Sequence, residues 1–167
     1  MGGIFVNLSQ GRHVADASHR IRKSQRQDAG NLEETQVTDN NLIGARFYNL
    51  MMIDYDCKTL KEVKECLKKA PMYCYRIYQT PNGFNVFLMS IVTPYYERDS
   101  YNMMMYLNCD PFYALFSHKY GYNVRLSKKK NREGDFIAKY LETIGDQTKI
   151  EKSFIKLHDN LIAHENI

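Results

Sequence analysis

The clearest structural signal in this chain is the sequence YRIYQTPNGFNVFL, at residues 75–88. Tyr, Ile, Val and Phe dominate both ends of the stretch, and aromatic and β-branched residues favour strands. Between the two ends, the sequence TPNG combines Pro, Asn and Gly, which are the residues of tight turns. We therefore predict two antiparallel strands, over residues 73–79 and 84–92, that form a hairpin.

Before the hairpin, an apolar run over residues 47–53 has the length of a strand and ends in the sequence DYD. A helix is predicted after it, over residues 59–70, because apolar residues recur there at helical spacing. Thr59 and Glu62 have the spacing of a capping box at the start of this helix. The segment before the hairpin is therefore predicted as a strand followed by a helix.

After the hairpin, residues 99–118 are predicted as a helical section with a break at Asp110 and Pro111. Asp suits the N-cap of a new helix, and Pro suits its first position. A strand is predicted over residues 121–127. The order strand, helix, strand, strand, helix, strand is the βαββαβ arrangement of a ferredoxin-like or RRM-like α+β fold. Such a fold has one four-stranded antiparallel sheet with helices on one face.

Length and charge distribution predict the domain organisation. The chain has 167 residues, of which 44% are hydrophobic and 25% charged, which suits one ordinary folded domain. Residues 1–42 are predicted as an N-terminal arm or extension, because residues 11–26 are polar and basic without apolar periodicity. Residues 43–167 are predicted as a single α+β domain. It ends in two further helices, over residues 136–144 and 150–161.

Composition also indicates where the protein is located and which partners it binds. No apolar run reaches the roughly 18 residues of a membrane span, and no secretory signal follows the N-terminus. We therefore expect an intracellular protein that is not secreted. The net charge of +4 is mild, but basic residues are concentrated in residues 11–26 and 119–132, which favours a polyanionic partner. Residues 1–42 and the C-terminal helix are the segments expected to bind protein partners.

Residues two apart on a strand point to the same face of a sheet. Asp54 and Asp56 therefore project together, and two carboxylates at this spacing suit a divalent cation such as Mg²⁺ or Mn²⁺. Alternatively, this pair only ends the strand, with Asp56 capping the next helix or pairing with Arg76 or Arg125. The face opposite the predicted helices is expected to collect the side chains of Arg76, Tyr78, Asn85, Phe87, Asn123, Arg125 and Ser127.

Four motifs occur in order along the chain: MIDYD (52–56), the hairpin (75–88), DPFY (110–113) and YNVRLSK (122–128). This series resembles the archaeo-eukaryotic primase (primase-polymerase) superfamily, and especially its small viral and bacterial relatives. The resemblance covers roughly residues 46–130. It implies an RRM-like sheet, which agrees with the predicted element order.

The resemblance also implies roles for individual residues. Asp54 and Asp56 match the acidic pair that holds metal ions for nucleotidyl transfer. Asn85 stands where family members have a His that contacts the phosphates of the incoming nucleotide, and Arg125 stands on the strand that carries their third acidic residue. An Asn can still hydrogen-bond a phosphate without carrying charge, whereas an Arg repels a second cation. The altered motifs imply a catalytically degenerate domain whose candidate catalytic residues are Asp54, Asp56 and Asn85.

We therefore expect a primase-like domain that binds single-stranded nucleic acid or a nucleotide in a replication or virus-associated setting. Aromatic side chains would stack on bases, and basic ones would contact phosphates. No cofactor is required beyond a possible Mg²⁺ or Mn²⁺ ion at Asp54 and Asp56. The residues expected to contact the ligand are Arg76, Tyr78, Asn85, Phe87, Arg125, Lys128, Lys129 and Lys130.

Two alternative functions stay open from the sequence. One is a divalent-metal-dependent nucleotidyltransferase with an altered site, in which Asp110 or Asp135 supplies the missing carboxylate. The other is a structural or interaction protein, such as a virion or replication-complex component, that uses the same fold for assembly.

Overall fold

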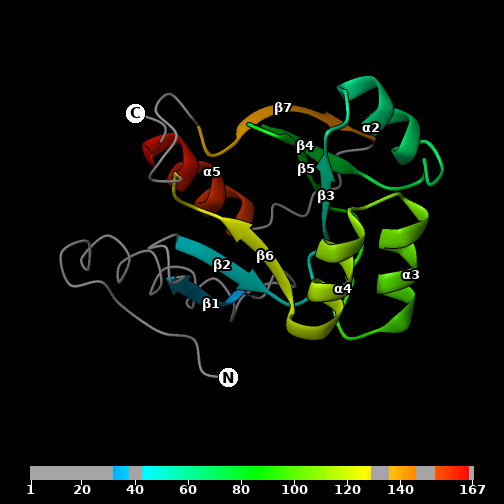
Figure 1. Ribbon diagram of the computed structural model, residues 1–167, viewed down its shortest axis with the longest axis horizontal. Helices are drawn as coiled ribbons and strands as arrows, with labels where there is room; N and C mark the ends of the chain where they lie inside the picture. The colour runs from blue at the N-terminus through cyan, green and yellow to red at the C-terminus, as the bar shows by residue number, and fades with distance from the viewer. Residues whose placement is uncertain (1–31, 38–42, 129–135, 146–152, 166–167) are drawn as a thin grey trace.

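The computed structural model describes residues 32–37, 43–128, 136–145 and 153–165. Over these residues the chain forms seven strands and four helices, so the predicted α+β class is confirmed (Figure 1). In chain order the elements are β1 (Leu32–Val37), β2 (Ile43–Phe47), β3 (Met52–Asp56), α2 (Leu60–Leu67), β4 (Tyr75–Thr80), β5 (Gly83–Leu88), α3 (Arg98–Tyr106), α4 (Pro111–Tyr120), β6 (Tyr122–Arg125), β7 (Lys139–Ile144) and α5 (Ser153–Glu165).

The strands form two antiparallel sheets in place of the single sheet predicted. One sheet has the order β3-β5-β4-β7, and the other has the order β1-β2-β6. β6, expected as the fourth strand of the single sheet, pairs instead with β2, so the ferredoxin-like order is not confirmed. The apolar run predicted as one strand over residues 47–53 is divided by a bend at residues 48–50, which places its two ends in different sheets.

The bend between the two sheets is held by the segment that follows β5. The amide of Met51 donates to Thr93 Oγ1 (2.9 Å), and the carbonyl of Asn49 accepts from the amide of Thr93 (3.0 Å). Leu50 and Met51 are fully buried beside it. The hydroxyl and amide of Thr93 thus make the hydrogen bonds that a partner strand would otherwise have made with Met51 and Asn49. The buried side chains of Leu50 and Met51 fix the position of the bend.

The predicted hairpin is confirmed. β4 and β5 pair from Tyr75 opposite Leu88 to Thr80 opposite Gly83, with the turn between them. The helix predicted after β3 is α2, and its capping box is present: Thr59 Oγ1 accepts from the amide of Glu62 (3.2 Å), and Glu62 Oε2 accepts from the amide of Thr59 (2.6 Å). Local sequence signals were sufficient for these elements.

The helix predicted over residues 136–144 is wrong, because residues 139–144 form the edge strand β7. β7 pairs with β4, with an irregularity in register near Tyr78. The apolar residues of this segment fit a helical stripe. However, the backbone groups along the edge of β4 need hydrogen-bond partners, and residues 139–144 provide them by forming a strand. Tertiary pairing therefore overrides the helical pattern.

Part of the predicted N-terminal arm is also a strand. β1 lies within residues 1–42 and pairs with β2 along its length. The predicted N-terminal arm or extension therefore contains a strand over residues 32–37. Residues 1–31 and 38–42 lie outside the described residues.

Helices lie on both faces of the larger sheet. On one face, the hydroxyl of Tyr55 donates to the carbonyl of Leu107, after α3, and the hydroxyl of Tyr75 donates to the carbonyl of Ala70, after α2 (both 2.7 Å). The other face carries Tyr78, which contacts Asp159 of α5. Figure 1 shows α2 and α5 on opposite sides of these strands. The face opposite α2, expected to carry exposed polar and aromatic side chains, is therefore covered by the C-terminal helix α5.

None of the helices in the described part of the chain has the length and apolar character needed to cross a membrane.

Candidate nucleotide-binding site

The candidate site is built on a row of side chains that crosses the larger sheet. Asp54 of β3 lies directly opposite Asn85 of β5, and Asn85 lies directly opposite Tyr78 of β4. Directly opposed residues of antiparallel strands point to the same face. The predicted common face is therefore confirmed for these three residues. Asp56 is paired with Gly83 at the end of β3 and is exposed, whereas Asp54 is half-buried.

The loop that begins α4 makes hydrogen bonds with both backbone polar groups of Asp54. The amide of Asp54 donates to Cys109 Sγ (3.4 Å), and its carbonyl accepts from the amide of Asp110 (2.8 Å). Asp110 itself caps α4, because its Oδ1 accepts from the amide of Tyr113 (2.8 Å) and Pro111 follows it. The predicted N-cap is confirmed, and it places a second carboxylate near Asp54.

Burial and neighbouring charges raise the pKa of Asp54 from 3.8 to about 7. The largest cause is loss of hydration, followed by repulsion from Asp56 and Asp110, while the positive charge of Arg125 acts in the opposite direction. Asp54 therefore changes its charge near neutral pH. Such a carboxyl group can take up or release a proton, or exchange its proton for a bound cation.

Arg125 approaches Asp54 from the other sheet. Its strand, β6, is fastened to α4 by Tyr113, whose hydroxyl donates to the carbonyl of Asn123 (2.9 Å) and accepts from the amide of Asn123 (3.2 Å). Burial raises the pKa of Tyr113 well above its ordinary value, so this hydroxyl stays protonated and can serve as a donor. The site therefore lies where the two sheets meet, with Arg125 contributed by β6.

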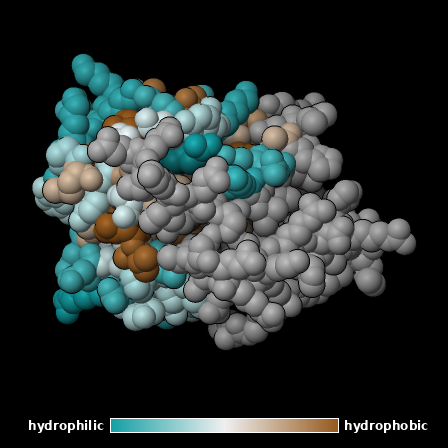
Figure 2. Space-filling view, turned by 180° about the vertical axis from the view of Figure 1, so that it is seen from behind, coloured by the Kyte–Doolittle hydropathy of each residue, from teal (hydrophilic) through white to brown (hydrophobic). Residues whose placement is uncertain are grey.

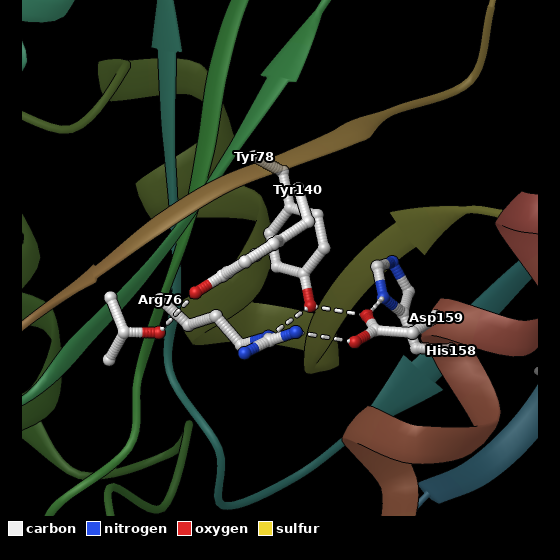
Figure 3. Close-up of polar contacts among 6 residues, drawn as sticks. Arg76, Tyr78, Tyr140, His158 and Asp159 are labelled. Atoms are coloured by element: carbon white, nitrogen blue, oxygen red, sulfur yellow. Dashed lines mark hydrogen bonds and ion pairs between the residues drawn. The ribbon is translucent and has the colours of Figure 1, made fainter. Parts of the chain in front are cut away.

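A second group of polar side chains lies farther along the same sheet face. We call it the Arg76 cluster; it consists of Arg76, Tyr78, Tyr140, His158 and Asp159 (Figure 3). Arg76 Nη2 donates to Asp159 Oδ2 (2.6 Å), and Arg76 Nε donates to the hydroxyl of Tyr78 (2.7 Å). The Tyr78 hydroxyl in turn donates to Asp159 Oδ1. The guanidinium group lies 3.9 Å from the centre of the Tyr140 ring.

The two aromatic rings expected to stack on bases are buried. Tyr78 and Phe87 are both 0% exposed, and the ring of His158 packs edge-on against them at centroid distances of 5.0 and 5.2 Å. Phe87 also packs against Phe47 of the smaller sheet. In this arrangement α5 occupies the space that a stacked base would need.

The structure therefore places Asp54, Asp56, Asn85 and Arg125 in one region. Arg76 and Tyr78 instead make hydrogen bonds with Asp159 of α5. Lys128 is half-buried; Lys129, Lys130 and Asp135 lie outside the described residues. The contributions of Tyr140, His158 and Asp159 were not predicted. No local sequence signal identifies them, because their roles depend on where β7 and α5 pack.

The donor atoms at Asp54 do not fit the two-ion site that the primase resemblance implies. Asp54 and Asp56 offer carboxylates, but the third position is a cation, Arg125. Within the described ranges, no group of three or more His, Cys, Asp or Glu side chains is arranged to hold a metal ion.

No family model, no curated protein and no solved structure matches this chain. The resemblance to primase-polymerases stays a prediction from the motifs.

Proposed function

We propose that this chain is a catalytically degenerate primase-polymerase-like domain that binds a nucleotide or single-stranded nucleic acid in a replication or virus-associated setting. One observation carries the proposal. Asp54 and Asn85 lie opposite each other on β3 and β5, and Arg125 of β6 is close enough for its positive charge to offset part of the rise in the pKa of Asp54. Three strands thus contribute polar side chains to the same region of the molecule.

Each of these side chains suits a phosphorylated ligand. The guanidinium group of Arg125 can hydrogen-bond two phosphate oxygens at once, and the amide of Asn85 can donate one further hydrogen bond. A single Mg²⁺ or Mn²⁺ ion, when bound by Asp54 and Asp56, would neutralise phosphate charge. Arg125 stands where a second ion would need a carboxylate, which favours binding over transfer chemistry.

Replacing Arg125 with Ala is expected to weaken binding of an oligothymidylate of about 20 nucleotides by roughly tenfold. Because one phosphate contact is lost, the slope of log affinity against log salt concentration should also fall by about 0.7 for a single strand. Fluorescence anisotropy over a salt series measures both quantities. Arg98→Ala is the matched control, because it removes the same charge from an exposed position on α3.

Two outcomes would contradict the proposal. Absence of binding by the wild-type chain at low salt, to either the oligonucleotide or a deoxynucleoside triphosphate, excludes it. Mn²⁺-dependent primer synthesis that Asp54→Ala abolishes would instead establish the nucleotidyltransferase alternative.

A second candidate function is assembly with another protein chain. It is favoured by α4, which buries small residues and exposes large apolar ones. This helix buries its small residues Ala114 and Ser117, while Phe112 is 84% exposed and Leu115 and Phe116 are 58% and 48% exposed. Residues at this spacing lie on one helix face. Figure 2 shows hydrophobic patches among hydrophilic side chains on the described surface seen from behind.

The exposed face of α4 has the size of an interaction site. The exposed parts of Phe112, Leu115 and Phe116 present roughly 400 Å² of apolar surface, within the range of functional patches on monomers. Two copies that pair through this face about a two-fold axis would bury roughly 800 Å² of apolar surface in total, which suits a weak contact. The expected occupant is therefore a second copy of this chain.

Replacing Phe112 with Asp is expected to convert a weak dimer to a monomer, because the interface would then bury an unpaired charge. Analytical ultracentrifugation over a concentration series measures the change. Met72→Asp, at another exposed apolar position, should leave the association unchanged. A wild-type chain that stays monomeric at the highest concentrations would remove this second candidate.

A further inference from the structure

The Arg76 cluster has the geometry of an anion-binding site that holds a carboxylate. Arg76 and Tyr78 both donate to the carboxylate of Asp159, one to each oxygen. His158 Nδ1 also lies 3.2 Å from Asp159 Oδ1. A guanidinium group and a hydroxyl that converge on two oxygens would bind two oxygens of a phosphate group in the same way.

The anion in this site is charged at neutral pH. Burial alone would raise the pKa of Asp159, but hydrogen bonds from His158 and Tyr78 and the charge of Arg76 lower the pKa below its ordinary value. A negatively charged carboxylate competes directly with phosphate for the same donors. Arg76 therefore already binds a negatively charged group with two oxygens, and the phosphate of the proposed ligand has the same charge and a similar shape.

The contact between α5 and the sheet is suited to exchange. The side chains of Arg76 and Asp159 retain 23% and 28% exposure, so water reaches the ion pair and limits its contribution to stability. The described buried side chains of α5 are Ile155, His158 and Ile162. An external anion can therefore reach the ion pair without first opening a sealed core.

The cluster is also next to the proposed site. Tyr78 lies opposite Asn85, and Asn85 lies opposite Asp54, so the two sites are separated by two strand spacings, roughly 10 Å. An extended ligand with several phosphates can reach both. A base could stack on Tyr78 or Phe87 only after α5 has moved away.

We propose that Arg76 and Tyr78 form a phosphate-binding site, and that Asp159 of α5 occupies it as an internal competitor that the phosphorylated ligand displaces. This inference rests on the proposed function, because it assigns regulation to the same sheet face. The shared ligand chemistry is a phosphate group, supplied either by a nucleotide or by the backbone of a single strand.

The test compares Asp159→Asn with wild type in anisotropy and competition assays. The probes are inorganic pyrophosphate, deoxythymidine triphosphate and the oligothymidylate. Asn keeps the shape of the side chain but removes the charge that competes with phosphate, so we expect about tenfold tighter binding. Asp99→Asn is the charge-matched control at an exposed position on α3, and it should change affinity less than about twofold. In an Arg76→Ala background, the gain from Asp159→Asn should disappear.

Hydrogen exchange of the wild-type chain gives a second measurement that needs no variant. Binding of the oligonucleotide should increase amide exchange in α5, because the helix loses its contact with Arg76 and Tyr78. Binding without this increase overturns the inference. A response to pyrophosphate alone would identify a free phosphate group as sufficient, whereas a response only to the oligonucleotide would identify the strand backbone.

The outcomes separate this inference from the proposed function. Equal gains from Asp159→Asn and Asp99→Asn, with binding still dependent on Arg125, would overturn the internal competitor and leave the proposed function standing. A gain that persists without Arg76 would do the same. Failure of wild type and Asp159→Asn to bind any of the probes would overturn both.

Discussion

Replacing Gly83 with Ala is expected to destabilise the protein by about 3 kcal/mol or more, which is the largest effect of a single methyl group that we predict. A Cβ atom at this position would lie 1.8 Å from the carbonyl oxygen of Tyr55 and 2.9 Å from its carbonyl carbon. Both atoms belong to the backbone of β3, so no side-chain rotation can relieve the clash. The strand itself must move away from β5.

The displaced segment is the one that carries the candidate site. Gly83 is paired with Asp56, and Asn85 is paired with Asp54, so separation of β5 from β3 would also pull these residues apart. We therefore expect the loss of stability to be accompanied by weaker ligand binding. No side chain larger than that of Gly can preserve the close approach of the two strands.

Urea unfolding followed by circular dichroism measures the loss of stability. Gly44→Ala is the matched control, because its Cβ would lie 3.3 Å from the carbonyl oxygen of Val124, a contact that a small shift relieves. That variant should lose about 1 kcal/mol or less. A Gly83→Ala protein as stable as the Gly44→Ala protein would show that β3 and β5 do not approach each other as described.

Stability is expected to fall as pH rises from about 5 to about 8, and Asp54→Asn is expected to remove most of this dependence. Asp54 has a pKa of about 7 in the folded chain, above its ordinary value of 3.8. Between these values the folded state holds a proton that the unfolded state releases, so increasing pH favours unfolding. One pKa unit corresponds to about 1.4 kcal/mol, and we expect a loss of about 2–3 kcal/mol over this range.

The same urea titrations at several pH values test this prediction. Asn has the shape of Asp without the charge, so the variant should be more stable than wild type at about pH 8 and close to it at about pH 5. Asp99→Asn, at an exposed position, should keep the wild-type slope. A wild-type slope that survives in Asp54→Asn would show that another group causes it.

Local signals were sufficient for much of the fold and for part of the site. The turn sequence before Gly83 specified the hairpin, and the spacing of Thr59 and Glu62 specified the start of α2. Strand alternation was enough to place Asp54 with Asp56 on one face of β3, and Asn85 with Phe87 on one face of β5. Each of these features depends on residues close in the sequence, whereas the pairing of β3 with β5, which sets Asp54 opposite Asn85, joins distant segments.

The remaining features depend on partners that are distant in the sequence. Residues 139–144 have a helical apolar pattern, yet they form β7 because β4 has a free edge. Arg125 reaches Asp54 from a separate sheet, and that position depends on the pairing of β6 with β2. Asp159 reaches Arg76 across 83 residues of sequence.

Local sequence was sufficient for the hairpin, for the caps of α2 and α4, and for the alternation of polar side chains along β3 and β5. The pairing of β3 with β5, the division of the strands into two sheets and the packing of α5 over Tyr78 and Phe87 depend on long-range contacts. The physical reason is that turns and caps are satisfied by neighbouring backbone groups, whereas sheet edges and apolar faces are satisfied by whichever distant segment packs best against them.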